Sequence, residues 1–248
     1  MKPRYPVVIL LFFGLVFFSG TQKAMANKLK IGYIEFPPFT YTEAGGKPSG
    51  ILIDLANKVF HDAGYEFEAF SYPVRRLASY IGSGDLDVWM GLKTLPEFTG
   101  KAYIGDAIIA ELVLRAYTKG KKTPILVKED LIGKSIIVLR GYSYGGWITF
   151  IEDPKNNINH IKANKHEAAF NMLKADRADF LLDYKEPSDM ALQKIRINDL
   201  EYNQISALPC YFVVSRANPK GQDIIKKLEK SHEKLKKEGA LNPLSTQQ

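Results

Sequence analysis

The chain has 248 residues, a length that allows either one large domain or two lobes of about a hundred residues each. Its single cysteine, Cys210, excludes an intramolecular disulfide. The formal net charge of +7 admits a nucleic-acid surface, but the basic excess gathers in a predicted helix near the C-terminus, where glutamates are interspersed, as at Glu233 and Lys237. Charges at this spacing pair on a solvated helix face, so we expect no nucleic-acid partner.

The N-terminus has the three-part pattern of a secretory signal. Lys2 and Arg4 precede an apolar run at 7–18, and a small-x-small triplet follows at 24–26. A membrane-spanning helix needs about 20 apolar residues, so this run is too short to be one and fits a cleaved leader. We therefore expect residues 1–26 to be a signal peptide and the mature chain to be a periplasmic monomer.

Strand-like and helix-like segments alternate along the chain, which predicts an α/β fold. The first part predicts, in order, a strand at 29–34, an amphipathic helix from 51 to 64, a strand at 67–72, a short helix ending at 82 and a strand at 86–92. The middle part predicts a strand at 134–139, a turn-rich loop at 141–146, helices at 147–151 and 168–173, and a strand at 179–182. An amphipathic helix near the C-terminus completes the order.

Two apolar, β-rich runs flank the middle of the chain, at 107–117 and 206–215. We interpret them as paired hinge strands that connect two lobes. The first lobe is then discontinuous and comprises 27–109 and 210–248, and the second lobe is 110–209. The last helix is expected to pack back on the first lobe.

Two stretches in different halves of the chain share one pattern. Residues 80–91 and 172–183 each read as a helix end, a polar turn, an aspartate and a buried strand. This echo indicates lobes of similar construction. Ligands of open α/β sheets bind at the carboxyl ends of strands, so we expect Gly91 and Asp183 to face a common cleft.

Five motifs together carry a family resemblance. They are the aromatic-proline loop at 35–39, the glycine-lysine entry into the first helix at 46–55, the strand and loop at 82–98, the Asp-Leu-Ile-Gly-Lys lead at 130–134 and the segment at 178–183. In order and spacing they resemble the bacterial extracellular solute-binding proteins of family 3, the polar amino-acid-binding type. The resemblance covers essentially the whole mature chain.

This resemblance implies the α/β, two-lobed type II periplasmic binding-protein fold with two hinge strands. It also implies capture of a small polar solute, amino-acid-like or an organic acid or amine, for an ATP-binding-cassette permease in the inner membrane. No cofactor and no metal are expected. The candidate ligand-binding residues are Tyr33, Phe36, Arg76, Gly91, Lys93, Arg140, Tyr142, Ser143, Tyr144, Asp183 and Tyr184.

The resemblance assigns roles to some of these candidates. Phe36 matches an aromatic that stacks on the ligand, and Gly91 matches a backbone contact at the end of a strand. The family's amine-binding aspartate maps to Asp183 or, one place on, to Tyr184, and we favour Asp183.

Phe98 stands where members of the family usually have an arginine that grips the ligand's α-carboxylate. A carboxylate buried without a cation is costly. Either the ligand lacks an α-carboxylate, or Arg76, Lys93 or Arg140 supplies the charge.

Catalytic patterns are weak in this chain. The histidines have no metal-like or triad-like neighbours at informative spacing; they are His61, His160, His166 and His232. We therefore expect a binding protein and not an enzyme. A ligand sensor acting on a membrane partner is the alternative, and a dehydratase-like enzyme using Asp183 and Glu186 is a further one.

Overall fold

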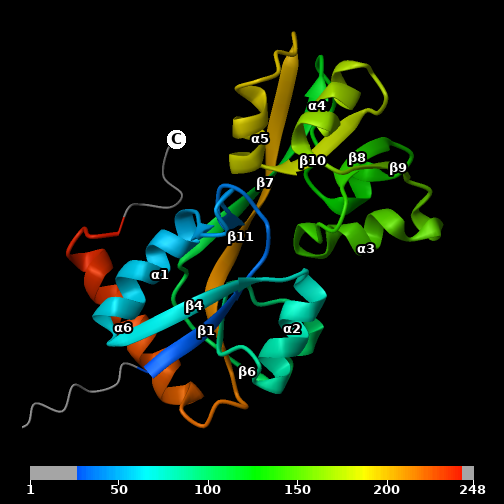
Figure 1. The fold of residues 1–248 in the computed structure, drawn as a ribbon. Helices are drawn as coiled ribbons and strands as arrows, with labels where there is room; N and C mark the ends of the chain where they lie inside the picture. Colours follow the sequence, from blue (N-terminus) through cyan, green and yellow to red (C-terminus); the bar gives the residue numbers. More distant parts are fainter. Residues whose placement is uncertain (1–26, 242–248) are drawn as a thin grey trace, which may run out of the picture.

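The computed structural model describes residues 27–241, which form two lobes connected by two long strands (Figure 1). The predicted signal peptide lies outside the described residues. The first-lobe elements are β1 (Asn27–Tyr33), β2 (Tyr41–Thr42), β3 (Pro48–Ser49), α1 (Ile51–Asp62), β4 (Tyr65–Ser71), α2 (Val74–Ser83), β5 (Val88–Leu92), the 3₁₀ turn η1 (Pro96–Phe98), β6 (Ala102–Ile104) and α6 (Gly221–Lys237). The remaining elements are β7 (Ala110–Lys119), η2 (Lys128–Leu131), β8 (Ser135–Leu139), η3 (Tyr144–Gly146), α3 (Trp147–Glu152), η4 (Pro154–Asn156), β9 (Asn159–Ala163), α4 (His166–Lys174), β10 (Phe180–Tyr184), α5 (Lys185–Leu192) and β11 (Leu200–Ser215).

One path of paired strands runs through both lobes, in the order β4-β1-β5-β11-β7-β10-β8-β9, with β6 added on β11. In the first lobe β1 is parallel to β4 and to β5, and in the second lobe β8 is parallel to β10 and to β9. Parallel strands with intervening helices are the signature of α/β architecture, so the predicted fold class is confirmed.

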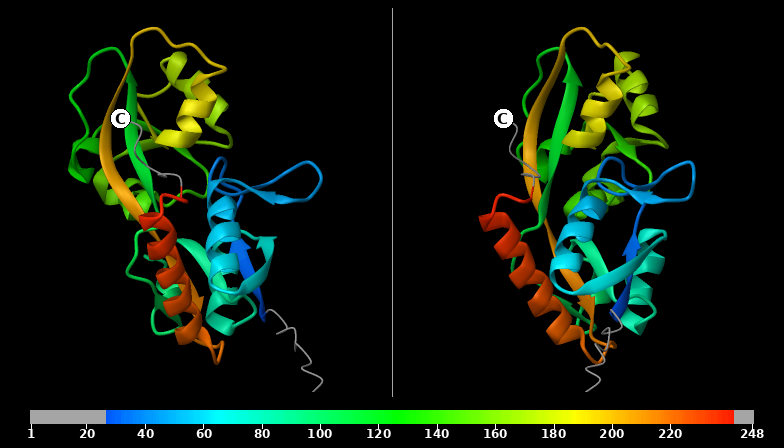
Figure 2. Two further views of the ribbon diagram at one scale, coloured as in Figure 1. Left: turned by 90° about the vertical axis from the view of Figure 1, so that its left-hand side faces the viewer. Right: turned by 60° about the vertical axis from the view of Figure 1, so that its left-hand side comes forward.

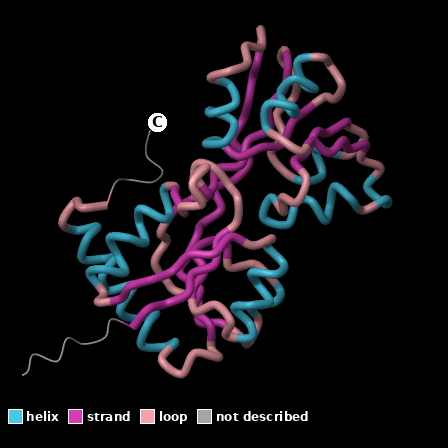
Figure 3. The backbone as a smooth tube through the Cα atoms, in the orientation of Figure 1, coloured by secondary structure: helices cyan, strands magenta, loops and turns pink. Residues whose placement is uncertain are grey.

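The predicted pairing of two hinge strands is also confirmed. β7 and β11 run antiparallel, with partners from Leu200 and Lys119 at one end to Cys210 and Ala110 at the other. Figures 2 and 3 show both strands passing from one lobe into the other. The pairing is irregular at one place, between Gln204 and Ser206. The exact lobe boundaries stay a prediction.

Alternation along β5 explains why helices cover both faces of the first-lobe sheet. Val88 and Met90 point into the core cluster that contains buried residues of α1 and α6. Trp89 points to the opposite face, into a cluster with Leu77 and Ile81 of α2. Successive side chains of a strand alternate between faces, so one apolar strand supports a helix layer on each side.

The second-lobe sheet follows the same rule along β8. Ile137 belongs to the cluster that includes Phe170 of α4, whereas Ile136 and Val138 belong to the cluster that includes Ile151 of α3. Both lobes are thus three-layered, with helices on each face of a short parallel sheet.

The last helix, α6, packs against α1 of the first lobe, as the sequence predicts. Ser231 Oγ donates hydrogen bonds to the Val59 carbonyl at 2.9 Å and to Asp62 Oδ2 at 2.8 Å. The predicted ion pair between Glu233 and Lys237 is present at 2.6 Å on the exposed face. Among residues 27–241, the helices are all too short or too polar to cross a membrane.

The sequence echo between the lobes corresponds to a repeated hydrogen-bond motif. Lys30 N–H donates to Asp87 Oδ2 at 2.7 Å, and Asp87 N–H donates to the Lys30 carbonyl at 2.8 Å. In the second lobe Ser135 N–H donates to Asp179 Oδ2 at 3.0 Å, and Asp179 N–H donates to the Ser135 carbonyl at 2.9 Å. Each aspartate therefore ties the start of its own strand to the parallel neighbour.

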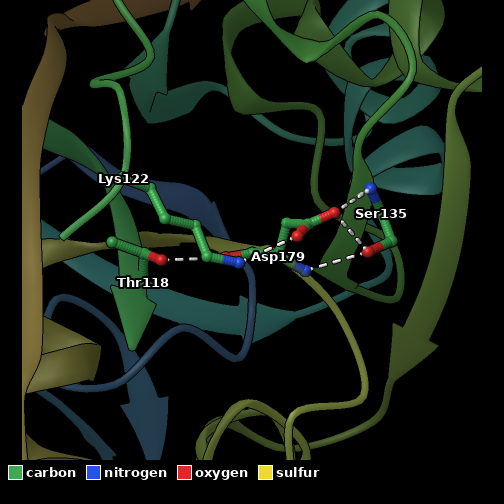
Figure 4. A network of polar contacts seen from close by, with 4 residues as sticks. All are labelled: Thr118, Lys122, Ser135 and Asp179. Carbon is green, nitrogen blue, oxygen red and sulfur yellow. Dashed lines mark hydrogen bonds and ion pairs between the residues drawn. The ribbon is translucent and has the colours of Figure 1, made fainter. Parts of the chain in front are cut away.

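Asp179 is further held by side chains from two other segments (Figure 4). Its Oδ1 accepts from Lys122 Nζ at 2.8 Å, its Oδ2 accepts from Ser135 Oγ at 2.7 Å, and its carbonyl accepts from Thr118 Oγ1 at 3.0 Å. The hydrogen bond from Lys122, followed by those from Ser135, holds the pKa of Asp179 well below its ordinary value.

This network predicts an acid-sensitive contribution to stability. Because the folded-state pKa of Asp179 is depressed, the contribution is complete above the unfolded-state pKa of about 3.9 and is lost as the pH falls below it. We expect Asp179→Asn to lower the free energy of unfolding by about 1–3 kcal/mol near pH 7. The difference from the native protein should shrink as denaturant unfolding is repeated toward pH 3.

Asp176→Asn is the matched control. Asp176 pairs with Lys119 at 2.6 Å, but its side chain is 70% exposed, so its loss should change stability by less than about 0.5 kcal/mol. Equal losses in the two variants, or a loss at Asp179 that does not vary with pH, would contradict the assignment.

Candidate functional site

A cavity of about 110 Å³ lies between the lobes, against the hinge strands. It is lined by Ile34, Phe36, Phe39, Thr40, Leu52, Val74, Trp89, Met90, Gly91, Leu92 and Leu95 from the first part of the chain, by Gly141, Tyr142, Ser143 and Tyr184 from the middle part, and by Leu112 and Cys210 from β7 and β11. Within residues 27–241, the lining includes no Asp, Glu, Lys, Arg or His. The side-chain polar groups of the lining residues are hydroxyls, one thiol and the indole N–H of Trp89.

The loop after β1 carries the first-lobe aromatics of this cavity. Glu35 organises the loop, because its carboxylate accepts hydrogen bonds from Thr42 N–H at 3.0 Å and from Ser71 Oγ at 2.6 Å. Burial raises the pKa of Glu35, but these bonds from Ser71 and Thr42 outweigh it and keep the pKa below its ordinary value. Tyr33 adds a hydrogen bond between its hydroxyl and Thr42 Oγ1 at 2.7 Å.

Phe36 contacts both lobes. Its ring stacks on Phe39 with centroids 5.3 Å apart, which holds it against its own lobe. It meets Tyr142 edge-on at 5.3 Å and Tyr184 edge-on at 5.4 Å. Edge-to-face pairs at this separation each contribute about 0.5–1.5 kcal/mol beyond area burial. Phe36 is therefore an aromatic bridge across one end of the cavity.

Trp89 covers the end of β5. Residues 89 and 91 lie on the same side of the strand, and a Cβ at Gly91 would lie 2.1 Å from Trp89 Cζ2. The indole N–H of Trp89 points back to the Leu92 carbonyl at 3.4 Å. Glycine is required at position 91 because the indole occupies the space that any side chain would take.

A hydrogen-bonded chain leads from the interior of the second lobe to the cavity. Asp183 is fully buried; its Oδ2 lies 2.7 Å from His166 Nδ1, and its Oδ1 accepts from Tyr184 N–H at 2.8 Å. His166 Nε2 lies 3.1 Å from the Tyr142 hydroxyl. Burial raises the pKa of Asp183, opposed by the hydrogen bond and charge of His166. Burial and the nearby Asp183 also raise the pKa of Tyr142, so its hydroxyl stays protonated.

Five of the sequence-predicted ligand residues line the cavity, namely Phe36, Gly91, Tyr142, Ser143 and Tyr184. The others lie outside its wall. Tyr33 is buried beneath the loop after β1, and Tyr144 is buried with its hydroxyl accepting from Leu139 N–H at 2.7 Å. Asp183 faces His166 behind the wall. Of the two register alternatives, Tyr184 is thus the one at the cavity.

The three candidate cations also lie outside the wall. Arg76 is exposed on α2. Lys93 Nζ lies 4.2 Å from the centroid of the Tyr211 ring, and Arg140 Nε donates to Asn164 Oδ1 at 2.9 Å. Their proposed ligand contacts stay predictions, and the described geometry directs Lys93 and Arg140 to other partners.

Phe98 serves the core of the first lobe. It is 4% exposed and belongs to the cluster of α2, with Leu77, Ile81 and Trp89. It is not part of the cavity wall. A charged side chain here would have to leave this cluster to reach a ligand.

Sequence reasoning missed two residues that shape the site. Trp89 is absent from the candidate ligand residues, yet it lines the cavity. The alternation of Trp89 and Gly91 was the available signal, because it places both on one face of β5. His166 had no such signal, since its partner Asp183 lies on another element and only the packing of α4 on β10 brings them together.

A model of the family "Bacterial extracellular solute-binding proteins, family 3" matches residues 29–247. A search of curated protein sequences found no match. Within residues 27–241, no group of three or more His, Cys, Asp and Glu side chains is placed to hold a metal ion.

Solved structures share the fold at low sequence identity. An ancestral arginine-binding protein bound to arginine has a TM-score of 0.65 and 22% identity, covering 88% of this chain and 96% of that one. A histidine kinase sensor domain with similarity to periplasmic binding proteins has a TM-score of 0.67 and 16% identity, with coverages of 88% and 92%. An ancestral amino acid-binding protein, a precursor of cyclohexadienyl dehydratase, has a TM-score of 0.64 and 18% identity, with coverages of 87% and 92%. These likenesses establish the two-lobed type II binding-protein fold.

The contact between Trp89 and Gly91 predicts a steric effect. Gly91→Ala should displace the indole, lower the free energy of unfolding by about 1–3 kcal/mol, and change the tryptophan fluorescence. In a Trp89→Leu background, Gly91→Ala should lower the free energy of unfolding by less. Denaturant unfolding of the native protein, the two single variants and the double variant measures this coupling. Gly45→Ala, where a Cβ meets nothing within 4 Å, is the control and should leave stability nearly unchanged. Additive losses would mean that the indole does not restrict position 91.

Proposed function

Because this chain belongs to the bacterial extracellular solute-binding proteins of family 3, we propose that it captures one small solute in the cavity between its lobes. The observation that supports this most directly is the composite wall, with Gly91 from the first lobe, Tyr142 and Ser143 from the second, and Leu112 and Cys210 from the hinge strands. A solute held there contacts both lobes at once. It therefore stabilises the closed arrangement over an open one by the contacts that only closure provides.

Closure is proposed to occur about β7 and β11. These strands are the long antiparallel pair that continues from lobe to lobe, and their irregular register between Gln204 and Ser206 is a place where the pairing is locally weakened. Hinge closure of two rigid lobes around a ligand is a common form of such transitions. The predicted boundaries, 27–109 with 210–248 and 110–209, divide the chain at these strands.

Delivery to an ATP-binding-cassette permease in the inner membrane is the proposed role of the loaded protein. The family supports a solute-binding role outside the cytoplasm, and the predicted signal peptide supports the periplasm as the compartment. The protein is proposed to act as a monomer without a cofactor. Sensing is the second candidate, because a histidine kinase sensor domain shares the fold. Deleting the gene for this protein should abolish cellular uptake of the bound solute if the role is import, and should leave uptake intact if the role is sensing.

Binding without turnover is the proposed chemistry. Asp183 and Glu186 were the carboxylates considered for catalysis, and neither lines the cavity. The Asp183 carboxylate accepts from Tyr184 N–H and is partnered by His166. These contacts support a structural role for Asp183, in which it positions His166 and Tyr142.

The proposal predicts that blocking the cavity abolishes binding. The mature chain, refolded to remove carried-over ligand, should be stabilised by about 2.7 kcal/mol by a solute at a hundred times its Kd. The solute is found by thermal unfolding against amino acids, amines, organic acids and uncharged aromatics. Ser143→Trp, in an exposed loop at the cavity wall, should remove this shift while the protein alone unfolds at nearly the native temperature.

Ser79→Trp on the exposed face of α2 is the control and should keep the full shift, because Ser79 is not part of the wall. If the Ser143→Trp variant retained the stabilisation by the solute, the binding site would have to lie outside this cavity.

A further inference from the structure

Among the described residues, the cavity wall contains no charged side chain and is mainly apolar. Phe36, Trp89, Met90 and Leu112 are among its apolar side chains. Burial raises the pKa of Cys210 to about 12, so the thiol in this wall is neutral at physiological pH. A ligand that brings a carboxylate or an ammonium group into such a wall loses hydration without gaining a partner, at a cost of several kcal/mol for each ion.

Two charged side chains that directly precede lining residues in the chain have partners inside the protein. Asp183, which the family resemblance marks for the ligand's amine, is paired with His166 and accepts from Tyr184 N–H. Arg140 Nε donates to Asn164. Among the described residues, the wall itself therefore presents neither a carboxylate nor a cation to a bound α-amino acid, and Asp183 and Arg140 are held by other partners.

The hydrogen-bond chain through His166 determines what the Tyr142 hydroxyl offers. In the neutral tautomer that carries its proton on Nδ1, His166 donates to the buried Asp183 carboxylate across 2.7 Å. In this tautomer Nε2 is an acceptor, and the Tyr142 hydroxyl, 3.1 Å away, donates a hydrogen bond to it. The lone pairs of the Tyr142 oxygen remain, so this hydroxyl is available as an acceptor for a ligand's donor.

The cavity is smaller than an apolar cavity that holds benzene, so without movement of its walls it holds at most a single ring. Its volume is about 110 Å³, and an apolar protein cavity of roughly 150 Å³ is known to hold benzene. The ring of Phe36 closes one end of the cavity by its contacts with Tyr142 and Tyr184, and the indole of Trp89 covers the end of β5. A larger solute would require these aromatics to move.

We propose that this cavity binds an uncharged, mainly apolar molecule of about the size of one benzene ring, which donates one hydrogen bond to the Tyr142 hydroxyl. This ligand class rests on the proposed solute-binding function and departs from the polar, amino-acid-like solute that the family resemblance implies.

The test uses four probes of similar size or known family type: phenol, toluene, benzoate and L-arginine. Isothermal titration of the mature chain, refolded to remove carried-over ligand, should show phenol binding about two- to tenfold more tightly than toluene, the effect of one net hydrogen bond. Benzoate and L-arginine should bind at least about a hundredfold more weakly than phenol, because each brings an unpaired charge.

Tyr142→Phe isolates the hydrogen bond. Its affinity for phenol should fall to that of toluene, and its affinity for toluene should not change. Tyr202→Phe, which removes a hydroxyl from a side chain that lies outside the wall and is 54% exposed, is the matched control and should bind all four probes as the native protein does. Thermal unfolding of both variants verifies that they are folded.

The outcomes separate the ligand class from the function. Tighter binding of L-arginine or benzoate than of phenol overturns the uncharged ligand and leaves solute binding standing. Equal affinities for phenol and toluene overturn the donor to Tyr142. If none of the probes binds, the ligand class is wrong, and solute binding is then judged by the Ser143→Trp experiment with whichever solute the wider panel identifies.

Discussion

The edge-on contacts of Phe36 with Tyr142 and Tyr184 set the separation of the two lobes at the cavity. One ring from the loop after β1 meets one aromatic from the loop after β8 and one from the end of β10, at 5.3 and 5.4 Å. The position of Phe36 depends in turn on its stacking with Phe39 and on the loop that Glu35 organises. Because these rings are rigid, the cavity between them has a defined size, and the chemistry of its wall decides what it can hold.

That wall differs from what the family resemblance implies, although the fold is shared. Phe98, at the position where the resemblance implies a carboxylate-binding arginine, fills the small core under α2, and Trp89 covers the strand end at Gly91. Asp183, to which the resemblance assigns the ligand's amine, is hydrogen-bonded to His166 within the second lobe. These changes are physically linked, since removing the cation and occupying the carboxylate both lower the cost of a dry, apolar cavity.

The lobes themselves are built alike and are tied together in the same way. Asp87 and Asp179 each exchange backbone and side-chain hydrogen bonds with the neighbouring parallel strand, at Lys30 and Ser135. Each sheet is covered by helices on both faces, so each lobe holds its own shape. The antiparallel pair of β7 and β11 connects the lobes, and it is the pair about which closure is proposed.

Local pattern in the sequence was sufficient for the α/β class, the paired hinge strands, the packing of the last helix and the echo between the lobes, because alternation and i,i+4 spacing are read within one element. The family resemblance identified the loop residues Phe36, Tyr142 and Ser143, which line the cavity. Local pattern could not predict side-chain contacts between elements that are distant in the sequence. His166 meets Asp183 only because α4 packs on β10, and the register of β10 alone directs Tyr184, and not Asp183, to the cavity. The order of elements was therefore a property of the sequence, whereas the charge of the site was decided by tertiary contacts, which determine the partner of each polar group.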